Sequence, residues 1–324
     1  MDDLETALNA IAPELGGAGV SDLRRLSGGA SQETWAFSLD TGRPLILRRK
    51  PAGATAVAGS GIPLATEAAL IRAAAALGAP VPEVLHVCAP DSAVGEAYVM
   101  NRIEGEALGK RIARDDAFAA VRPKLARQCG EVLAKIHAVP LEGLPALNHS
   151  SALDELEKYE AAYRGLGANR PIFEAAFRWL KDRAPPLDRP VLLHGDFRNG
   201  NIMFDPVRGV AAVLDWELAH IGDPAEDMGW LCTASWRFGG PGPVGGFGQY
   251  DDLLAGYEAA GGAPISLERV KYWQMLGSLK WGCMCLGMYG SFASGADPSV
   301  ERAMIGRRTS ETEIDLMALL EQAT

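Results

Sequence analysis

The sequence is short of several features that would indicate particular classes of protein. Aromatic residues make up only 7% of the 324 residues, and Lys and Arg number 31 against 41 for Asp and Glu. A formal net charge of −10 provides no broad basic surface for a phosphate backbone, so we expect no nucleic-acid partner. No apolar run reaches the length of about 18 residues that suggests a membrane span, so we expect no membrane partner.

Cysteine is also scarce. There are five cysteines, and only Cys283 and Cys285 lie close together in the sequence. No His follows them at ligand spacing, so buried free thiols are favoured over a zinc site or a disulfide framework. The odd count, together with an acidic N-terminus that has no apolar segment, predicts a cytoplasmic protein without a signal peptide.

The hydrophobic patterns predict an α+β fold in two parts, which we place at residues 1–104 and 105–324. The first part is predicted to hold an antiparallel sheet of about five strands with helices over 2–12 and 64–77. Its expected strands cover 22–26, 33–39, 44–48, 83–87 and 96–103. In the second part we expect helices over 113–138 with a restart at Pro123, 150–165, 170–183, 249–260, 267–289 and 298–323. We expect a loop-rich centre over 190–230 and a surface loop over the Gly/Pro-rich residues 239–248.

The strongest chemical signal is the segment His194-Gly-Asp-Phe-Arg-Asn-Gly-Asn201, followed by Asp215-Trp-Glu217 after an apolar, strand-like run. Phosphoryl transfer needs a carboxylate that orients the attacking hydroxyl and oxygen ligands that hold Mg²⁺. Asp196 and Asn201 lie in one predicted loop, where both side chains can point to one place. The alternative, that these are only turn residues, requires several residue types to match in order by chance.

These motifs resemble those of the aminoglycoside phosphotransferase and choline kinase superfamily, which has a bilobal protein-kinase-like fold. The resemblance implies an ATP-dependent and Mg²⁺-dependent kinase with Asp196 as the catalytic base. It implies that Asn201 and Asp215 bind Mg²⁺, with Glu217 near enough to assist. It also gives His194 a supporting role beneath the loop, and it gives the same role to Asp227 in Gly222-Asp-Pro-Ala-Glu-Asp227.

The first part of the chain then reads as the nucleotide-binding lobe, and the second as the catalytic and substrate lobe. Two glycines between predicted strands can bring backbone N–H groups over phosphates. Arg48 stands where the family has Lys, and Glu67 is the matching acid. The alternative for Arg48 is a solvated strand end. The expected nucleotide-binding residues are Ser27, Gly28, Gly29, Ala30, Ser31, Ile46, Arg48, Glu67, Met100, Asn101 and Ile103, the last three in a hinge that faces adenine.

The expected acceptor is the hydroxyl group of a small molecule. Little chain separates Glu217 from Pro224 and no Ala-Pro-Glu follows, whereas a protein kinase needs a longer segment to lay out a peptide. The segments Leu47-Arg-Arg-Lys-Pro51 and Trp216-Glu-Leu-Ala-His220 resemble the branch that animals carry fused to acyl-CoA dehydrogenases, which implies a hydroxyacyl or hydroxy acid acceptor. The alternative from another class is a non-catalytic ATP-binding module of the pseudokinase type.

Overall fold

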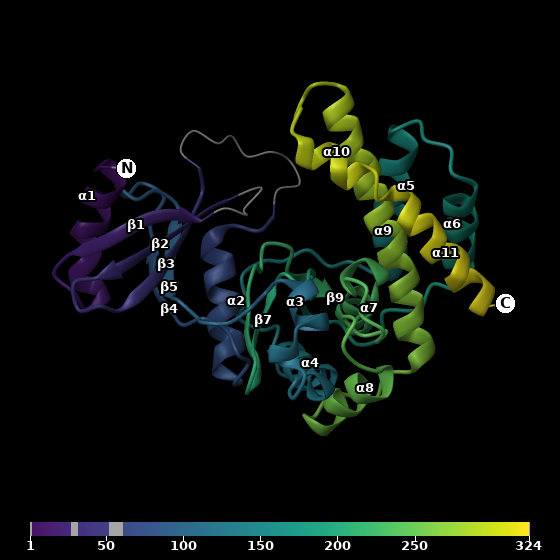
Figure 1. Ribbon diagram of the computed structural model, residues 1–324, viewed down its shortest axis with the longest axis horizontal. Coiled ribbons are helices and arrows are strands. Elements are labelled where there is room, and N and C mark those ends of the chain that lie inside the picture. The colour runs from purple at the N-terminus through teal and green to yellow at the C-terminus, as the bar shows by residue number, and fades with distance from the viewer. Residues whose placement is uncertain (1, 27–31, 52–60, 324) are drawn as a thin grey trace.

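The computed structural model describes residues 2–26, 32–51 and 61–323. The predicted phosphate-binding residues Ser27, Gly28, Gly29, Ala30 and Ser31 lie outside the described residues. In Figure 1 the sheet lies at one end of an elongated molecule and most of the helices lie at the other. Among the described residues, no helix combines the length and hydrophobicity that crossing a membrane requires.

The N-terminal part is built on a five-stranded sheet in which all neighbouring strands are antiparallel, as the sequence predicts. The order of its strands is β1-β2-β3-β5-β4. Their bounds are β1 Val20–Leu26, β2 Glu33–Leu39, β3 Pro44–Arg49, β4 Val84–Cys88 and β5 Ala97–Asn101. The central place of β3 carries its side chains into the middle of the sheet.

Helices cover both faces of this sheet. Along β3 the side chains alternate, so Leu45 and Leu47 pack in the cluster formed with α1 (Asp2–Ile11) and the 3₁₀ turn η1 (Ala12–Leu15). Ile46 packs on the opposite face with α2 (Leu64–Ala76). Arg48 shares that face, which places its guanidinium beside α2 and the helical part.

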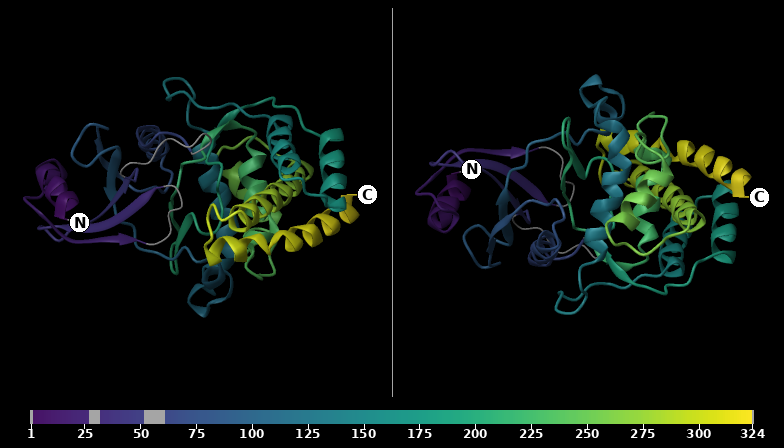
Figure 2. Two further views of the ribbon diagram at one scale, coloured as in Figure 1. Left: turned by 90° about the horizontal axis from the view of Figure 1, so that it is seen from above. Right: turned by 90° about the horizontal axis from the view of Figure 1, so that it is seen from below.

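The C-terminal part is organised around α9 (Leu267–Ala293), the longest helix described, at 27 residues. Its first half is buried on nearly all sides, and it packs against α7 (Ala225–Cys232) and α5 (Ala152–Gly165). The other elements are α3 Gly109–Arg114, η2 Asp116–Phe118, α4 Arg122–His137, α6 Pro171–Asp182, η3 Ala234–Trp236, α8 Tyr250–Ala259, α10 Val300–Gly306 and α11 Thr309–Ala323. Figure 2 shows α9 to α11 at the end of the molecule opposite the sheet.

Several predicted boundaries need correction. The centre expected to be loop-rich holds two small two-stranded sheets, β6 (Val191–Leu193) with β9 (His220–Gly222), and β7 (Ile202–Asp205) with β8 (Gly209–Val213), followed by α7. Strands this short carry too few residues for a clear alternating pattern. The restart expected at Pro123 is found, because α4 begins beside this proline, which favours the first turn of a helix. The residues before it form α3 and η2 and not the start of the same helix. The expected helix 298–323 is likewise divided between α10 and α11.

The Gly/Pro-rich segment 239–248 is not the surface loop that we expected. Val244 and Phe247 are buried, and so are the glycines that flank them. A Cβ added at Gly246 would lie 2.2 Å from the carbonyl oxygen of Arg237, so the missing side chain is what lets the backbones approach. All five cysteines are free and buried, as predicted.

Candidate active site

The segment that contains Asp196 connects β6 with β7 and begins with a forced turn at Gly195. Gly195 has φ of +80°, and a Cβ there would lie 2.2 Å from the carbonyl oxygen of Leu218. Glycine is therefore required between His194 and Asp196. The turn holds the Asp196 side chain partly exposed, at 14% of its possible area.

The Asp196 carboxylate accepts four hydrogen bonds. Its Oδ1 accepts from Arg198 Nε at 2.9 Å and from Trp230 Nε1 at 2.6 Å. Its Oδ2 accepts from Arg198 Nη2 at 3.1 Å and from Asn201 Nδ2 at 2.6 Å. An ionised carboxylate has about four acceptor positions, so these donors occupy all of them.

Two of these donors were missed at the level of the sequence. Arg198 lies two residues after Asp196, and its basic character was the signal available. Its guanidinium lies 4.4 Å from the ring centroid of Trp236, which supports its plane by a cation–π contact. Trp230 comes from α7 and carried no signal, because an indole that donates to a carboxylate looks like any core tryptophan in the sequence.

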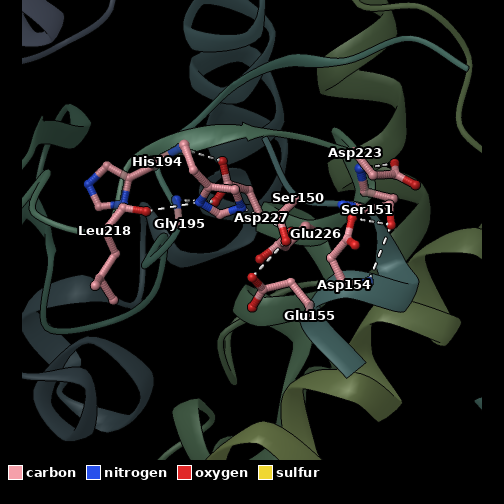
Figure 3. Close-up of polar contacts among 12 residues, drawn as sticks. Ser150, Ser151, Asp154, Glu155, His194, Gly195, Leu218, Asp223, Glu226 and Asp227 are labelled. Atoms are coloured by element: carbon pink, nitrogen blue, oxygen red, sulfur yellow. Dashed lines mark hydrogen bonds and ion pairs between the residues drawn. The ribbon is translucent and has the colours of Figure 1, made fainter. Parts of the chain in front are cut away.

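His194 and Asp227 lie beneath this turn and fix its backbone, as Figure 3 shows. Asp227 Oδ2 accepts the N–H of His194 and Oδ1 accepts the N–H of Gly195, both at 2.9 Å. The His194 ring lies 2.9 Å from Leu214 O through Nε2, and its Nδ1 lies 3.2 Å from the Asp196 N–H. Because Nδ1 accepts and Nε2 donates, the ring carries its hydrogen on Nε2.

Asp227 is fully buried and also contacts His137 of α4. The His137 Nε2 lies 3.2 Å from Asp227 Oδ2, and its Nδ1 lies 3.1 Å from the hydroxyl of Tyr257. Burial alone would raise the pKa of Asp227, but His137 and the backbone N–H of His194 outweigh it and hold that pKa below its ordinary value. Asp227 is therefore an anion whose charge is shared by the turn and by α4.

The predicted metal ligands lie together. Asn201 and Asp215 are held close because the N–H of Leu214 donates to the carbonyl oxygen of Asn201 at 2.7 Å. Asp215 has φ of +66°, a left-handed conformation that Asp adopts more readily than most residues. The side-chain amide of Asn201 donates its N–H to Asp196, which leaves the amide oxygen of Asn201 for another partner. Within the described residues, no group of three or more His, Cys, Asp or Glu is placed to hold a metal ion.

On the sheet side, Arg48 connects the predicted nucleotide-binding residues to Asp215. Its Nη2 donates to Asp215 Oδ1 at 2.8 Å, and its Nε lies 3.7 Å from Glu67 Oε2 on α2. Gln32 joins the same network, since it accepts from Arg48 and donates to Glu67. Arg48 is thus a bound element of the site and not a solvated strand end.

Glu67 is fully buried within this network. The hydroxyl of Tyr98 donates to its Oε2 at 3.1 Å. Burial raises the pKa of Glu67 to about 7, although Arg48 and Gln32 act in the opposite direction. The charge on Glu67, and with it the ion pair with Arg48, therefore changes near neutral pH.

The expected hinge lies at and just after the end of β5. Met100 is buried at the end of β5, and its neighbour Asn101 donates its N–H to Glu83 O at 3.0 Å. That N–H is therefore already engaged in the sheet. Among the described residues, no hydrogen bond is found for the N–H of Ile103, which leaves it for a ligand.

The segment 239–248 contributes to the site from behind. The Asn199 amide donates to Trp236 O at 2.9 Å and to Gly245 O at 2.7 Å. Asn199 lies between Arg198 and Gly200, so the buried glycine-rich backbone anchors the far side of the catalytic turn. The sequence predicted neither this contact nor the burial on which it depends.

Comparison with known proteins agrees with this geometry. The phosphotransferase enzyme family matches residues 22–269 of the chain, and the chain belongs to this family. The fold is shared with a putative aminoglycoside phosphotransferase from Ralstonia eutropha, at a TM-score of 0.78 and 22% identity over 98% of both chains. It is also shared with a thermostable mutant of the aminoglycoside phosphotransferase APH(4)-Ia in ternary complex with AMP-PNP and hygromycin B, at a TM-score of 0.59 and 18% identity over 97% of this chain and 98% of that one.

Curated relatives support the branch that the sequence suggested. The chain is 31% identical to acyl-CoA dehydrogenase family member 10 of Mus musculus over 67% of its length, and 28% identical to family member 11 of Gallus gallus over 92%. It spans only 20% and 41% of those proteins. The expected superfamily and the kinase-like fold are thus confirmed.

Proposed function

We propose that the protein transfers the γ-phosphoryl group of ATP to a hydroxyl of a small molecule. Residues 1–104 form the nucleotide-binding lobe in this proposal, and residues 105–324 form the catalytic and substrate lobe. The observation that carries it is the continuous chain of contacts from Arg48 to Asp215, and from Asn201 to Asp196. These contacts bring a cation from the sheet, two potential metal ligands and a candidate base to one place.

Asp196 accepts the proton of the attacking hydroxyl while the phosphoryl group passes from ATP to that oxygen and ADP leaves. Because four donors fill its carboxylate, one of them must give way to the hydroxyl. Arg198 is the donor best able to leave, since its side chain is 24% exposed whereas Trp230 is buried. The released guanidinium then lies near the transferring phosphoryl group, whose negative charge it can stabilise.

The donor set for a metal consists of oxygens, which suits Mg²⁺. Asn201 and Asp215 would hold it, with Glu217 close by. When bound, Mg²⁺ neutralises phosphate charge and orients the polyphosphate. Arg48 contributes a fixed positive charge beside Asp215, and Glu67 keeps that side chain in place. The solved relative with AMP-PNP supports the choice of ATP.

A hydroxyacyl or hydroxy acid compound is the acceptor class that we propose, in line with the relatives that carry the acyl-CoA dehydrogenase name. Aminoglycosides are polycations and would need a wall of unpaired carboxylates. In the cavity beside Gly195, the carboxylates of Asp154, Glu155 and Glu217 are all engaged with other residues.

Release of ADP in the presence of ATP and Mg²⁺ tests this function. The acceptor panel should hold 3-hydroxybutyrate, 4-hydroxybutyrate, their coenzyme A thioesters, choline, homoserine and kanamycin. The proposal predicts acceptor-dependent ADP release with at least one hydroxyacyl or hydroxy acid compound, and a phosphorylated product by mass spectrometry. Nucleotide binding without transfer to any acceptor would instead support a non-catalytic module.

A further inference from the structure

A cavity of about 510 Å³ lies beside the turn that holds Asp196. It is lined by α5, by α9 and by the segment 217–220, and Gly195 and Glu217 form the part of its wall nearest the reacting residues. Its volume lies within the roughly 300–1,000 Å³ that is usual for small-molecule sites. It is therefore large enough to take the acceptor.

Lys280 is the unusual residue in its wall. It comes from the buried half of α9 and is only 7% exposed. Its ammonium lies 4.8 Å from the ring centroid of Trp230 and 5.6 Å from that of Tyr159. Among the described residues, this ammonium makes no hydrogen bond and no ion pair, although a buried cation normally has such a partner.

The other charged groups near the cavity already have partners. Glu155 accepts from Ser150 at 2.8 Å and lies 3.3 Å from the ammonium of Lys158. Glu226, behind the wall, lies 3.3 Å from His220. Asp154 accepts from the hydroxyl and the N–H of Ser151, and Glu217 lies 4.0 Å from Arg48. Among these charged groups, Lys280 is therefore the one without a hydrogen-bond or ion-pair partner in the described part of the chain.

That charge is present at neutral pH. Burial alone would lower the pKa of Lys280, but Tyr159 and the carboxylates of Glu226, Glu155 and Asp196 together raise it above its ordinary value. The carboxylates are close enough to favour the cation by their field, yet none of them forms an ion pair with it. A cationic acceptor would be repelled here, whereas a single negative charge would gain a desolvated partner.

Lys280 is also placed to position an acceptor for Asp196. The indole of Trp230 lies between them, because its ring faces the ammonium and its Nε1 donates to Asp196 Oδ1 at 2.6 Å. An anion held by Lys280 and a hydroxyl held by Asp196 would thus be separated by about the width of one indole ring. A short hydroxycarboxylic acid has these two groups at such a separation.

We propose that Lys280 binds the carboxylate of a hydroxycarboxylic acid acceptor in this cavity, and so sets the specificity of the phosphoryl transfer. The proposal rests on the function proposed above and adds the residue that selects the acceptor. A monoanion is preferred to a phosphate monoester, because a second negative charge would face the carboxylates of Glu155 and Glu217.

The test compares 3-hydroxybutyrate with its methyl ester, and it includes glycerol 3-phosphate as a phosphate-bearing alcohol. For the wild type, we expect kcat/KM to favour the acid over the ester. In Lys280→Met, which keeps the buried stem without its charge, the ratio of acid to ester should fall by about 30-fold or more, through KM for the acid. Lys158→Met is the matched control, since Lys158 lines the same cavity but is paired and exposed, and its ratio should stay that of the wild type.

A second arm measures binding without catalysis. Saturation-transfer NMR with 3-hydroxybutyrate should show binding to the wild type and to Lys158→Met, and its loss in Lys280→Met. Circular dichroism and the affinity for AMP-PNP establish that each variant is folded. The proposal is overturned if the wild type prefers the ester or glycerol 3-phosphate, or if Lys280→Met binds the acid as well as the wild type does. Binding without turnover would leave this site standing while removing the proposed transfer.

Discussion

Arg48 on β3 donates a hydrogen bond of 2.8 Å to Asp215, 167 residues further along the chain. This contact joins the sheet to the segment that would hold the metal, and Glu67 at 3.7 Å holds the other side of the guanidinium. The residue at this position in relatives of this kind was expected to be Lys. The structure shows that Arg48 reaches three acidic residues, Glu67, Asp215 and Glu217, from the same place.

Replacing Arg48 tests whether its charge or its shape matters more. Arg48→Met should lower kcat/KM for ATP by about 100-fold, because a charge near the phosphates is lost and Glu67 and Asp215 lose their common partner. Arg48→Lys keeps the charge but loses the planar guanidinium with its several N–H donors, and should retain activity to within about 10-fold. Steady-state kinetics at varied ATP concentration give both values. Equal losses of kcat/KM in the two variants would show that the planar guanidinium itself is required.

The pH dependence of ATP use should follow Glu67. Its pKa of about 7 means that the carboxyl loses its proton as the pH rises through neutrality, and only then is the ion pair with Arg48 complete. We therefore expect kcat/KM for ATP to fall on the acid side with an apparent pKa near 7. Glu67→Gln should show a lower but flatter profile in that range. An unchanged acid limb in this variant would assign the limb to another group.

The contact of His220 with Glu226 should stabilise the fold at low pH and lose this effect at high pH. Burial alone would lower its pKa, but Glu226 at 3.3 Å raises it to about 9 from an ordinary value of 6.5. A raised histidine pKa stabilises the fold below the ordinary value, and this contribution is lost as the pH rises through 9. The shift corresponds to at most about 3 kcal/mol. Urea unfolding of the wild type and of Glu226→Gln should show this difference at about pH 6 and little of it at about pH 10.

Asp227 should matter for both folding and catalysis. Asp227→Asn keeps the shape of the side chain but replaces one carboxylate oxygen with an NH₂ group. One of the two N–H groups of His194 and Gly195 then loses its acceptor, so we expect a loss of about 2–4 kcal/mol in the free energy of unfolding. Urea unfolding measures this loss. His137→Phe removes the contacts of α4 with Asp227 and Tyr257 but leaves both backbone N–H bonds to Asp227 in place, so it should cost less. Equal stability of Asp227→Asn and the wild type would mean that the buried anion does not hold the turn.

Much of this site could be predicted from the sequence, because the acidic residues and Asn201 lie in a short motif with fixed spacing. The residues that surround them could not. Trp230, Lys280 and His137 belong to buried helical faces, where the sequence pattern indicates only a core. Their roles arise because α7 contacts the turn that holds Asp196, while α4 and α9 contact α7, and such long-range packing leaves no local signal.

The burial of the segment 239–248 is a further feature that the sequence did not predict. Gly and Pro predicted a loop correctly, since they disfavour both helix and strand. They did not predict burial, which depends on how closely the backbone can approach Arg237 and Asn199. The hydrogen bond of Asn101 to Glu83 in the hinge could not be predicted either, because it follows from the pairing of β4 with β5 and not from either residue type.

The most direct test of the proposed chemistry is acceptor-dependent ADP release by Asp196→Asn, measured beside AMP-PNP binding by calorimetry. The variant keeps the size of the side chain but cannot take the hydroxyl proton, so turnover should fall by about 10²–10⁴-fold while AMP-PNP binds within a few-fold of the wild type. Turnover close to that of the wild type in this variant would contradict Asp196 as the base.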